Sequence, residues 1–155
     1  MSSIAEIGAL LCKKELTLGS VESFTGGLFA SEVTAISGAS KYFKGALVTY
    51  ATEEKVRLLG IPSEEIEKHG VVSKEIAYLM AKLGKEKLAV DYCLAFTGNA
   101  GPEAMENKPV GEIYIALAGP QKVEVQAFHL QGERNKIQKS AIDLALTLLA
   151  KTLQE

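Results

Sequence analysis

The chain has 155 residues, of which 47% are hydrophobic and 23% charged, and its formal net charge at pH 7 is −2. This length and composition are typical of one soluble globular domain, so we expect residues 1–155 to form a single unit. A net charge near zero argues against nucleic acid or an acidic membrane surface as a partner, and no apolar run approaches the ~20 residues of a membrane span.

The two cysteines, Cys12 and Cys93, both stand among apolar residues. Two thiols in a chain of this length do not make a disulfide framework, and the N-terminus lacks the pattern of a cleavable signal peptide. We therefore expect both cysteines in the core of a reduced, cytoplasmic protein.

The apolar pattern predicts strands and helices that alternate through the first two-thirds of the chain. Ser3 and Glu6 have the spacing of a helix capping box. The expected elements, in chain order, are a helix over 4–14, a strand over 16–22, a helix over 27–36, a strand over 42–50, helices over 52–60 and 63–70, a longer helix that Ser73 caps, a strand over 91–98, a hairpin of strands over 112–119 and 122–130, and a helix over 133–153.

This order of elements indicates an α/β fold. Alternating strands and helices imply parallel units, and the hairpin after residue 97 makes the sheet mixed. We expect a three-layer α/β/α sandwich with a mixed, mostly parallel sheet. Ligands of such sheets bind beyond the carboxyl ends of the parallel strands, so the residues that follow each strand are the candidates for function.

The first strand is followed by the segment SFTGG, which contains Ser23, Thr25, Gly26 and Gly27. Glycines let an anion approach the backbone, and the start of the next helix offers free N–H groups to it. The hydroxyls of Ser23 and Thr25 add donors, and one of them is a candidate nucleophile. The alternative is a tight turn in which both hydroxyls only cap the helix.

The second strand ends at Tyr50, and Lys55 follows five residues later. We expect Thr52 to cap the next helix, which places Lys55 in its first turn. There the helix dipole disfavours a cation, so the pKa of Lys55 should be lowered, as suits a general base. The alternative is a solvated lysine offset by Glu53 and Glu54.

The third strand runs into TGNAGP, in which Thr97 and Gly98 resemble a second anion cradle, although a simple turn is the alternative. Arg134 begins the last helix, where it could reach a phosphate or remain solvated. An anion site beside a Ser/Tyr/Lys cluster is workable for amide hydrolysis. No histidine or carboxylate cluster has metal-ligand spacing and no nucleotide fingerprint is present, so neither a metal nor a cofactor is expected.

The last helix is apolar on two sides, which predicts burial on both sides, either in a homo-oligomer or by deep packing within the chain. One stripe holds Ile137, Ala141, Leu144 and Leu148, and the other holds Ile142, Leu146, Leu149 and Leu153.

Several segments, including VESFTGG, EKHGVVSKEIA, FTGNAGP and GERNKIQ, have the order and spacing of the CinA C-terminal domain, the PncC-type nicotinamide-nucleotide amidases. The chain resembles this family from about residue 4 to 150, in a stand-alone form without the nucleotide-binding domain of full-length CinA. The resemblance implies an α/β/α fold, a homo-oligomer, and a pyridine nucleotide as partner. The implied reaction is hydrolysis of the carboxamide of nicotinamide mononucleotide to nicotinate mononucleotide and ammonia, without a metal.

The resemblance also implies roles for individual residues. Ser23 matches the family's nucleophile, and Tyr50 and Lys55 match the residues that activate it. Three further positions match residues near the substrate: Ser40, Thr97 and Arg134.

The chain departs from the family pattern at several positions near these residues. Phe24 stands where cysteine is usual, Asn99 replaces an aliphatic residue, Gln138 replaces an arginine, and residues 102–107 replace a glycine-rich loop. These departures leave two rival hypotheses open: a pyridine-nucleotide-binding protein without catalysis, and a regulatory or interaction protein linked to competence.

Overall fold

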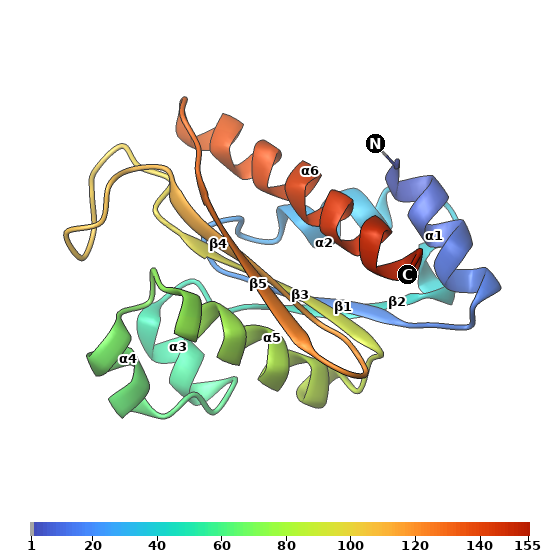
Figure 1. The fold of residues 1–155 in the computed structure, drawn as a ribbon, viewed down its shortest axis with the longest axis horizontal. Coiled ribbons are helices and arrows are strands. Elements are labelled where there is room, and N and C mark those ends of the chain that lie inside the picture. Colours follow the sequence, from blue (N-terminus) through green and yellow to red (C-terminus); the bar gives the residue numbers. More distant parts are fainter. Residues whose placement is uncertain (1) are drawn as a thin grey trace.

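The computed structural model describes residues 2–155, which contain one sheet of five strands in the order β2-β1-β3-β4-β5 (Figure 1). The strands are β1 (Leu18–Glu22), β2 (Phe43–Val48), β3 (Tyr92–Gly98), β4 (Glu112–Ala118) and β5 (Val123–His129). The helices are α1 (Ile4–Lys13), α2 (Leu28–Thr34), α3 (Thr52–Arg57), α4 (Ser63–His69), α5 (Lys74–Leu88) and α6 (Arg134–Leu153), with a single 3-10 turn, η1 (Ala39–Lys41). Every predicted helix and strand is present, with ends within a few residues of the prediction.

The sheet is mixed. Strand β1 lies between β2 and β3 and pairs in parallel with both, whereas β3–β4 and β4–β5 are antiparallel pairs. Strands β1, β2, β3 and β5 therefore run in one direction and β4 in the other. Helices α1, α2 and α6 cover one face, and α3, α4 and α5 lie on the other (Figure 1), which confirms the predicted α/β/α sandwich.

Apolar side chains fill both layers between the helices and the sheet. On the α1/α2/α6 side the ring of Phe29 packs on Phe43 and Phe96, with centroids 6.3 and 5.5 Å apart. On the α5 side Ile76 and Met80 are fully buried against the sheet. Burial of each such side chain stabilises the fold by about 1.5–3 kcal/mol.

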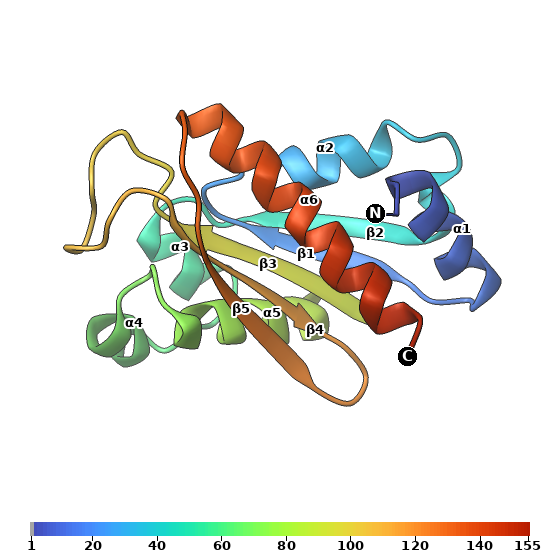
Figure 2. The ribbon, with the colours of Figure 1, turned by 45° about the horizontal axis from the view of Figure 1, so that its top comes forward.

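Helix α6 crosses the sheet beside α1 and α2 (Figure 2) and contacts both of these helices. This helix buries both of its apolar stripes within one chain. The two stripes are therefore a weaker reason to expect an oligomer. Residues of both stripes are buried without a partner, including Ile137, Ile142 and Leu149, while Leu144 is half-buried. The deep-packing alternative therefore accounts for the pattern, and homo-oligomer formation stays a prediction.

The expectation that both cysteines lie in the core was wrong for one of them. Cys12 is exposed near the end of α1, whereas Cys93 is buried on β3, where burial raises the pKa of its thiol to about 12. Both thiols are free. Among residues 2–155, no helix combines the length and apolar character needed to cross a bilayer.

Candidate active site

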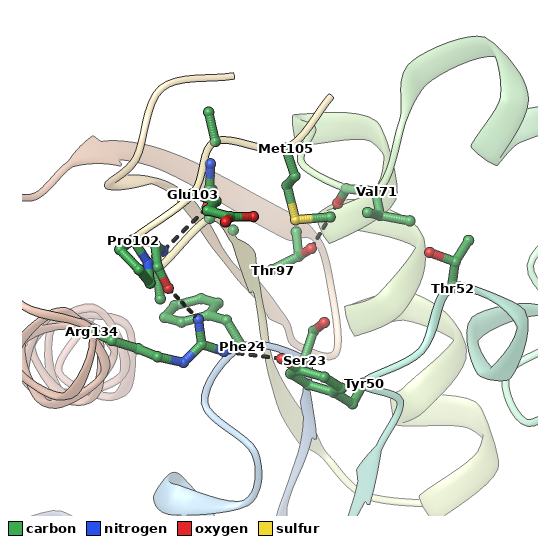
Figure 3. Close-up of a pocket in the computed structure, with 15 residues that line it drawn as sticks. Ser23, Phe24, Tyr50, Thr52, Val71, Thr97, Pro102, Glu103, Met105 and Arg134 are labelled. Carbon is green, nitrogen blue, oxygen red and sulfur yellow. Dashed lines mark hydrogen bonds between the residues drawn. The ribbon is translucent and has the colours of Figure 1, made fainter. Parts of the chain in front are cut away.

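The carboxyl ends of the three neighbouring parallel strands β2, β1 and β3 meet at one cavity of about 480 Å³. Ser23 follows β1 directly, Tyr50 lies just beyond β2, and Thr97 stands near the end of β3. All three side chains line the cavity together with Arg134 at the start of α6 (Figure 3). The topology thus brings together residues that are up to 111 positions apart, from Ser23 to Arg134.

The candidate nucleophile Ser23 is hydrogen-bonded to Lys55, which is buried next to the cavity and is not one of its lining residues. The Lys55 Nζ donates to Ser23 Oγ at 3.0 Å and to the Thr49 carbonyl oxygen at 2.6 Å, with the Tyr50 carbonyl oxygen at 3.5 Å. Lys55 is only 1% exposed and Ser23 only 8%. A lysine held against a serine hydroxyl away from water has the geometry of a nucleophile with its base.

Burial lowers the pKa of Lys55 to about 8, and the charges of Glu106 and Glu53 oppose that shift. The lowered pKa was predicted, but the reason given for it was wrong. Ala51, not Thr52, is the N-cap of α3, so Lys55 is the fourth residue of a six-residue helix and lies in its last turn. Removal from water, rather than the helix dipole, favours the neutral amine.

The start of α2, predicted to cradle an anionic ligand, holds the carboxylate of Glu22 instead. Gly26 and Gly27 have φ angles of 59° and 104°, which turn the chain so that the first N–H groups of α2 point back at the end of β1. Glu22 is fully buried and accepts five hydrogen bonds. The donors, at 2.9–3.2 Å, are the hydroxyls of Ser20 and Thr25 and the backbone N–H groups of Gly27, Phe29 and Ala30.

This arrangement changes the interpretation of the SFTGG turn. Thr25 is buried, and its hydroxyl donates a hydrogen bond to Glu22. Neither Thr25 nor the two glycines line the cavity. Their geometry fixes the turn that carries Ser23. The sequence gives a hint of this internal anion, an acidic residue at the end of an apolar strand and directly before a glycine turn, but it does not show which way the side chain points.

In the second predicted cradle, TGNAGP, the polar side chains also have hydrogen-bond partners within the chain. Thr97 Oγ1 donates to the Val71 carbonyl oxygen at 2.6 Å. The buried Asn99 side chain donates to the Lys108 carbonyl oxygen at 3.1 Å and accepts from the Gly101 N–H at 3.2 Å. Thr97, Gly98 and Asn99 do line the cavity, so this segment contributes shape and a hydroxyl at the end of β3.

Arg134 connects two walls of the cavity. Its guanidinium donates to the Gly101 carbonyl oxygen at 2.6 Å and to the Tyr50 hydroxyl at 3.0 Å (Figure 3). Tyr50 is 62% exposed at the cavity mouth, and its hydroxyl is bonded to Arg134 rather than to Ser23. Arg134 is the cationic side chain among the lining residues described, which makes it the candidate for an anionic group of a ligand.

Two family positions lie differently from what the resemblance implies. Ser40 lies outside this cavity and lines a separate hollow between α2 and β2 with Thr34 and Lys44. Gln138 donates to the Phe24 carbonyl oxygen at 2.8 Å and so supports the turn next to Ser23. Within residues 2–155, no group of three or more His, Cys, Asp or Glu side chains is placed to hold a metal ion.

The profile of the CinA C-terminal domain matches residues 2–153, and the chain belongs to this family. A CinA-like protein from Flavobacterium psychrophilum is 43% identical over 148 residues, which cover 95% of this chain and 35% of that protein. The chain thus spans about a third of the length of the curated relatives it matches.

Solved structures show the same fold. A competence/damage inducible protein from Agrobacterium tumefaciens has 28% identity and a TM-score of 0.89, with both chains fully covered. A CinA superfamily protein from Klebsiella pneumoniae has 23% identity and a TM-score of 0.93, with 99% of each chain covered. At the latter identity the likeness concerns the fold alone.

Proposed function

We propose that the chain hydrolyses the carboxamide of nicotinamide mononucleotide to nicotinate mononucleotide and ammonia, with Ser23 as the nucleophile and Lys55 as its base. The observation that carries this proposal is the 3.0 Å contact between the buried Lys55 Nζ and Ser23 Oγ. The family resemblance supplies the substrate class, and the paired side chains supply a route for the reaction.

The reaction begins with neutral Lys55, which is substantially populated near its pKa of about 8. Two of its N–H bonds face the carbonyl oxygens of Thr49 and Tyr50, which leaves the nitrogen lone pair for the Ser23 hydroxyl proton. As Lys55 takes this proton, Ser23 Oγ bonds to the carboxamide carbon. The oxygen of the carboxamide becomes negatively charged in the resulting tetrahedral intermediate.

The intermediate then breaks its carbon–nitrogen bond, and protonated Lys55 gives its proton to the leaving nitrogen, which departs as ammonia. Water then attacks the ester formed on Ser23 while Lys55 accepts a proton from it. Lys55 returns this proton to Ser23 Oγ as the ester bond breaks and nicotinate mononucleotide leaves. The backbone N–H of Phe24, a residue that lines the cavity, carries no hydrogen bond within residues 2–155 and directly follows the nucleophile. We assign it to the developing oxyanion.

The substrate phosphate is assigned to Arg134. Glu22 already takes the N–H groups at the start of α2, and the Thr97 hydroxyl is bonded to Val71, so these donors are not available to a phosphate. Arg134 lines the cavity and can exchange its neutral partners, the Gly101 carbonyl and the Tyr50 hydroxyl, for a phosphate.

The proposal is tested by ammonia release from a panel of nicotinamide mononucleotide, its riboside and nicotinamide dinucleotide, alongside direct binding measurements. We expect wild type to release ammonia from the mononucleotide, and Ser23→Ala to bind the same nucleotide without releasing ammonia. Equal ammonia release by both proteins would remove Ser23 as the nucleophile. Binding by both proteins without any ammonia would favour the nucleotide-binding hypothesis.

A further inference from the structure

The loop that joins β3 to β4, residues 99–111, forms a large part of the cavity wall, from Asn99 through Met105. It projects from the end of the sheet at which α3 and α4 lie (Figure 1). Within residues 2–155, two sets of hydrogen bonds fasten its middle part to distant elements. One is the contact from Arg134 to Gly101, and the other involves the side chain of Glu106.

Glu106 binds the backbone that leads into α5. Its two carboxylate oxygens accept hydrogen bonds from the Val71 and Val72 N–H groups, each at 2.9 Å. Gly70 leaves the room that this approach needs, because a Cβ there would come within 2.8 Å of Glu106 Oε1. Consecutive N–H groups that face one carboxylate form an anion-binding nest, and such charge-assisted bonds are among the stronger ones in proteins.

The segment that Glu106 holds belongs to the site. Val71 lines the cavity, and its carbonyl oxygen accepts the hydrogen bond of Thr97 Oγ1 at 2.6 Å. The Glu106 carboxylate therefore joins three parts of the cavity wall: the loop over 99–111, the turn that carries Val71, and the end of β3.

Glu106 also acts on the base through its charge, which raises the pKa of Lys55 against the effect of burial. Glu106 thus attaches the loop by hydrogen bonds and also adds a negative charge that acts on Lys55. The groups in contact with Lys55 Nζ are the Ser23 hydroxyl beyond β1 and the Thr49 and Tyr50 carbonyl oxygens beyond β2. The carboxylates whose charges raise the pKa of Lys55 are Glu53 on its own helix and Glu106 from the loop.

We propose that Glu106 is a positioning residue that fixes loop 99–111 as a wall of the cavity and couples this wall to the base Lys55. The kinetic part of this inference rests on the proposed amide hydrolysis. The attachment of the loop is a property of the folded chain and is tested without turnover.

The attachment is tested by amide hydrogen exchange in the full chain. In Glu106→Ala we expect the amides of Val71 and Val72 and the peptide over 99–111 to exchange faster than in wild type, while the amides of α6 stay protected. Glu106→Gln keeps one acceptor and should give intermediate rates. Unchanged exchange at Val71 and Val72 in the folded Glu106→Ala protein would overturn the proposal.

The coupling is tested by the titration of Lys55, followed through the NMR signals of its side chain, and by steady-state kinetics. In Glu106→Gln, Lys55 should titrate at lower pH than in wild type, because the variant lacks a negative charge that raises the pKa of Lys55. The same substitution should also increase KM for the mononucleotide about tenfold, as expected when a charge-assisted bond to a wall of the site is lost. The matched control is Glu53→Gln. It removes the other carboxylate whose charge raises the pKa of Lys55, and it leaves the nest around Glu106 intact.

We expect Glu53→Gln to lower the pH at which Lys55 titrates, while KM and the amide exchange at Val71 and Val72 stay as in wild type. If Glu106→Gln speeds exchange but leaves KM and the titration of Lys55 unchanged, the loop is attached without serving the site, and the proposal is wrong. If wild type turns over no nucleotide, the proposed function fails, while exchange and titration still decide the role of Glu106.

Discussion

The carboxylate of Glu22 accepts a hydrogen bond from the Phe29 backbone N–H at 3.0 Å, which places a buried negative charge at the first turn of α2. The partial positive charge at a helix start stabilises such an anion. Because Glu22 is the last residue of β1, this contact ties the end of that strand to α2 across the turn that holds Ser23. The position of the candidate nucleophile is thus set by an internal carboxylate.

Glu22→Gln should therefore destabilise the fold. Glutamine offers one acceptor oxygen where the carboxylate offers two, and its amide N–H groups would face other donors. We expect the free energy of unfolding, measured in urea, to fall by about 2–4 kcal/mol. Glu67→Gln, an exposed change on α4, is the control and should alter stability little. Equal stability of both variants would show that the Glu22 contacts do not hold the turn.

Gly27→Ala tests whether the glycine turn serves the fold or the ligand. The φ angle of 104° at Gly27 lies outside the region that alanine tolerates, whereas Gly26, at 59°, is in the left-handed helical region and a Cβ added there would meet nothing within 4 Å. We expect Gly27→Ala to cost about 1–3 kcal/mol of stability and Gly26→Ala less. The Kd of folded Gly27→Ala for the mononucleotide should stay close to that of wild type. A selective loss of phosphate binding would show that this turn binds the phosphate after all.

Lys55→Met should stabilise the protein while removing its activity. At pH 7 a charged Lys55 is held in a site where its pKa is about 8 instead of 10.5, and this destabilises the folded state. Methionine avoids the penalty, so we expect a gain on the order of 1–3 kcal/mol, reduced by the donors lost to Ser23 and Thr49.

The pH dependence of stability checks the sign of this effect. Between pH 8 and 10.5 the unfolded chain binds more protons at Lys55 than the folded chain does, so wild type should gain stability as the pH rises through this range. Lys55→Met should lack that gain. Parallel stability curves for the two proteins would mean that Lys55 titrates normally in the folded state.

Arg134→Gln tests the assignment of the phosphate. Loss of the guanidinium should weaken binding of nicotinamide mononucleotide by about tenfold or more, and it should change binding of the riboside little. Arg57→Gln removes the same charge from an arginine that does not line the cavity and serves as the control. Equal losses for nucleotide and riboside in Arg134→Gln would place the phosphate elsewhere.

The sequence predicted the fold and the location of the site better than the contacts within it. Period and capping patterns identified each α-helix and strand, and the rule for parallel strand ends placed Ser23, Tyr50 and Thr97 at one cavity. These are local or topological properties that a single sequence carries.

What the sequence missed depends on partners that only folding brings together. The glycine turn looked like a ligand cradle because the direction of the Glu22 side chain cannot be read from its place in β1. The α6 stripes suggested a second chain because the helices that cover them, α1 and α2, come from the other end of the sequence. Glu106 stood in a segment without a recognisable pattern and reaches back 35 residues to Val71.

The central claim, that a lysine removed from water activates Ser23, is tested most directly by the pH profile of kcat/KM for ammonia release from nicotinamide mononucleotide. The rate should rise with pH and level off near pH 8, where Lys55 loses its proton. Lys55→Met should lack this rise and lose about 10²–10⁴-fold in rate. A profile without this rise between pH 6 and pH 9, or one that Lys55→Met reproduces at the wild-type rate, would contradict the claim.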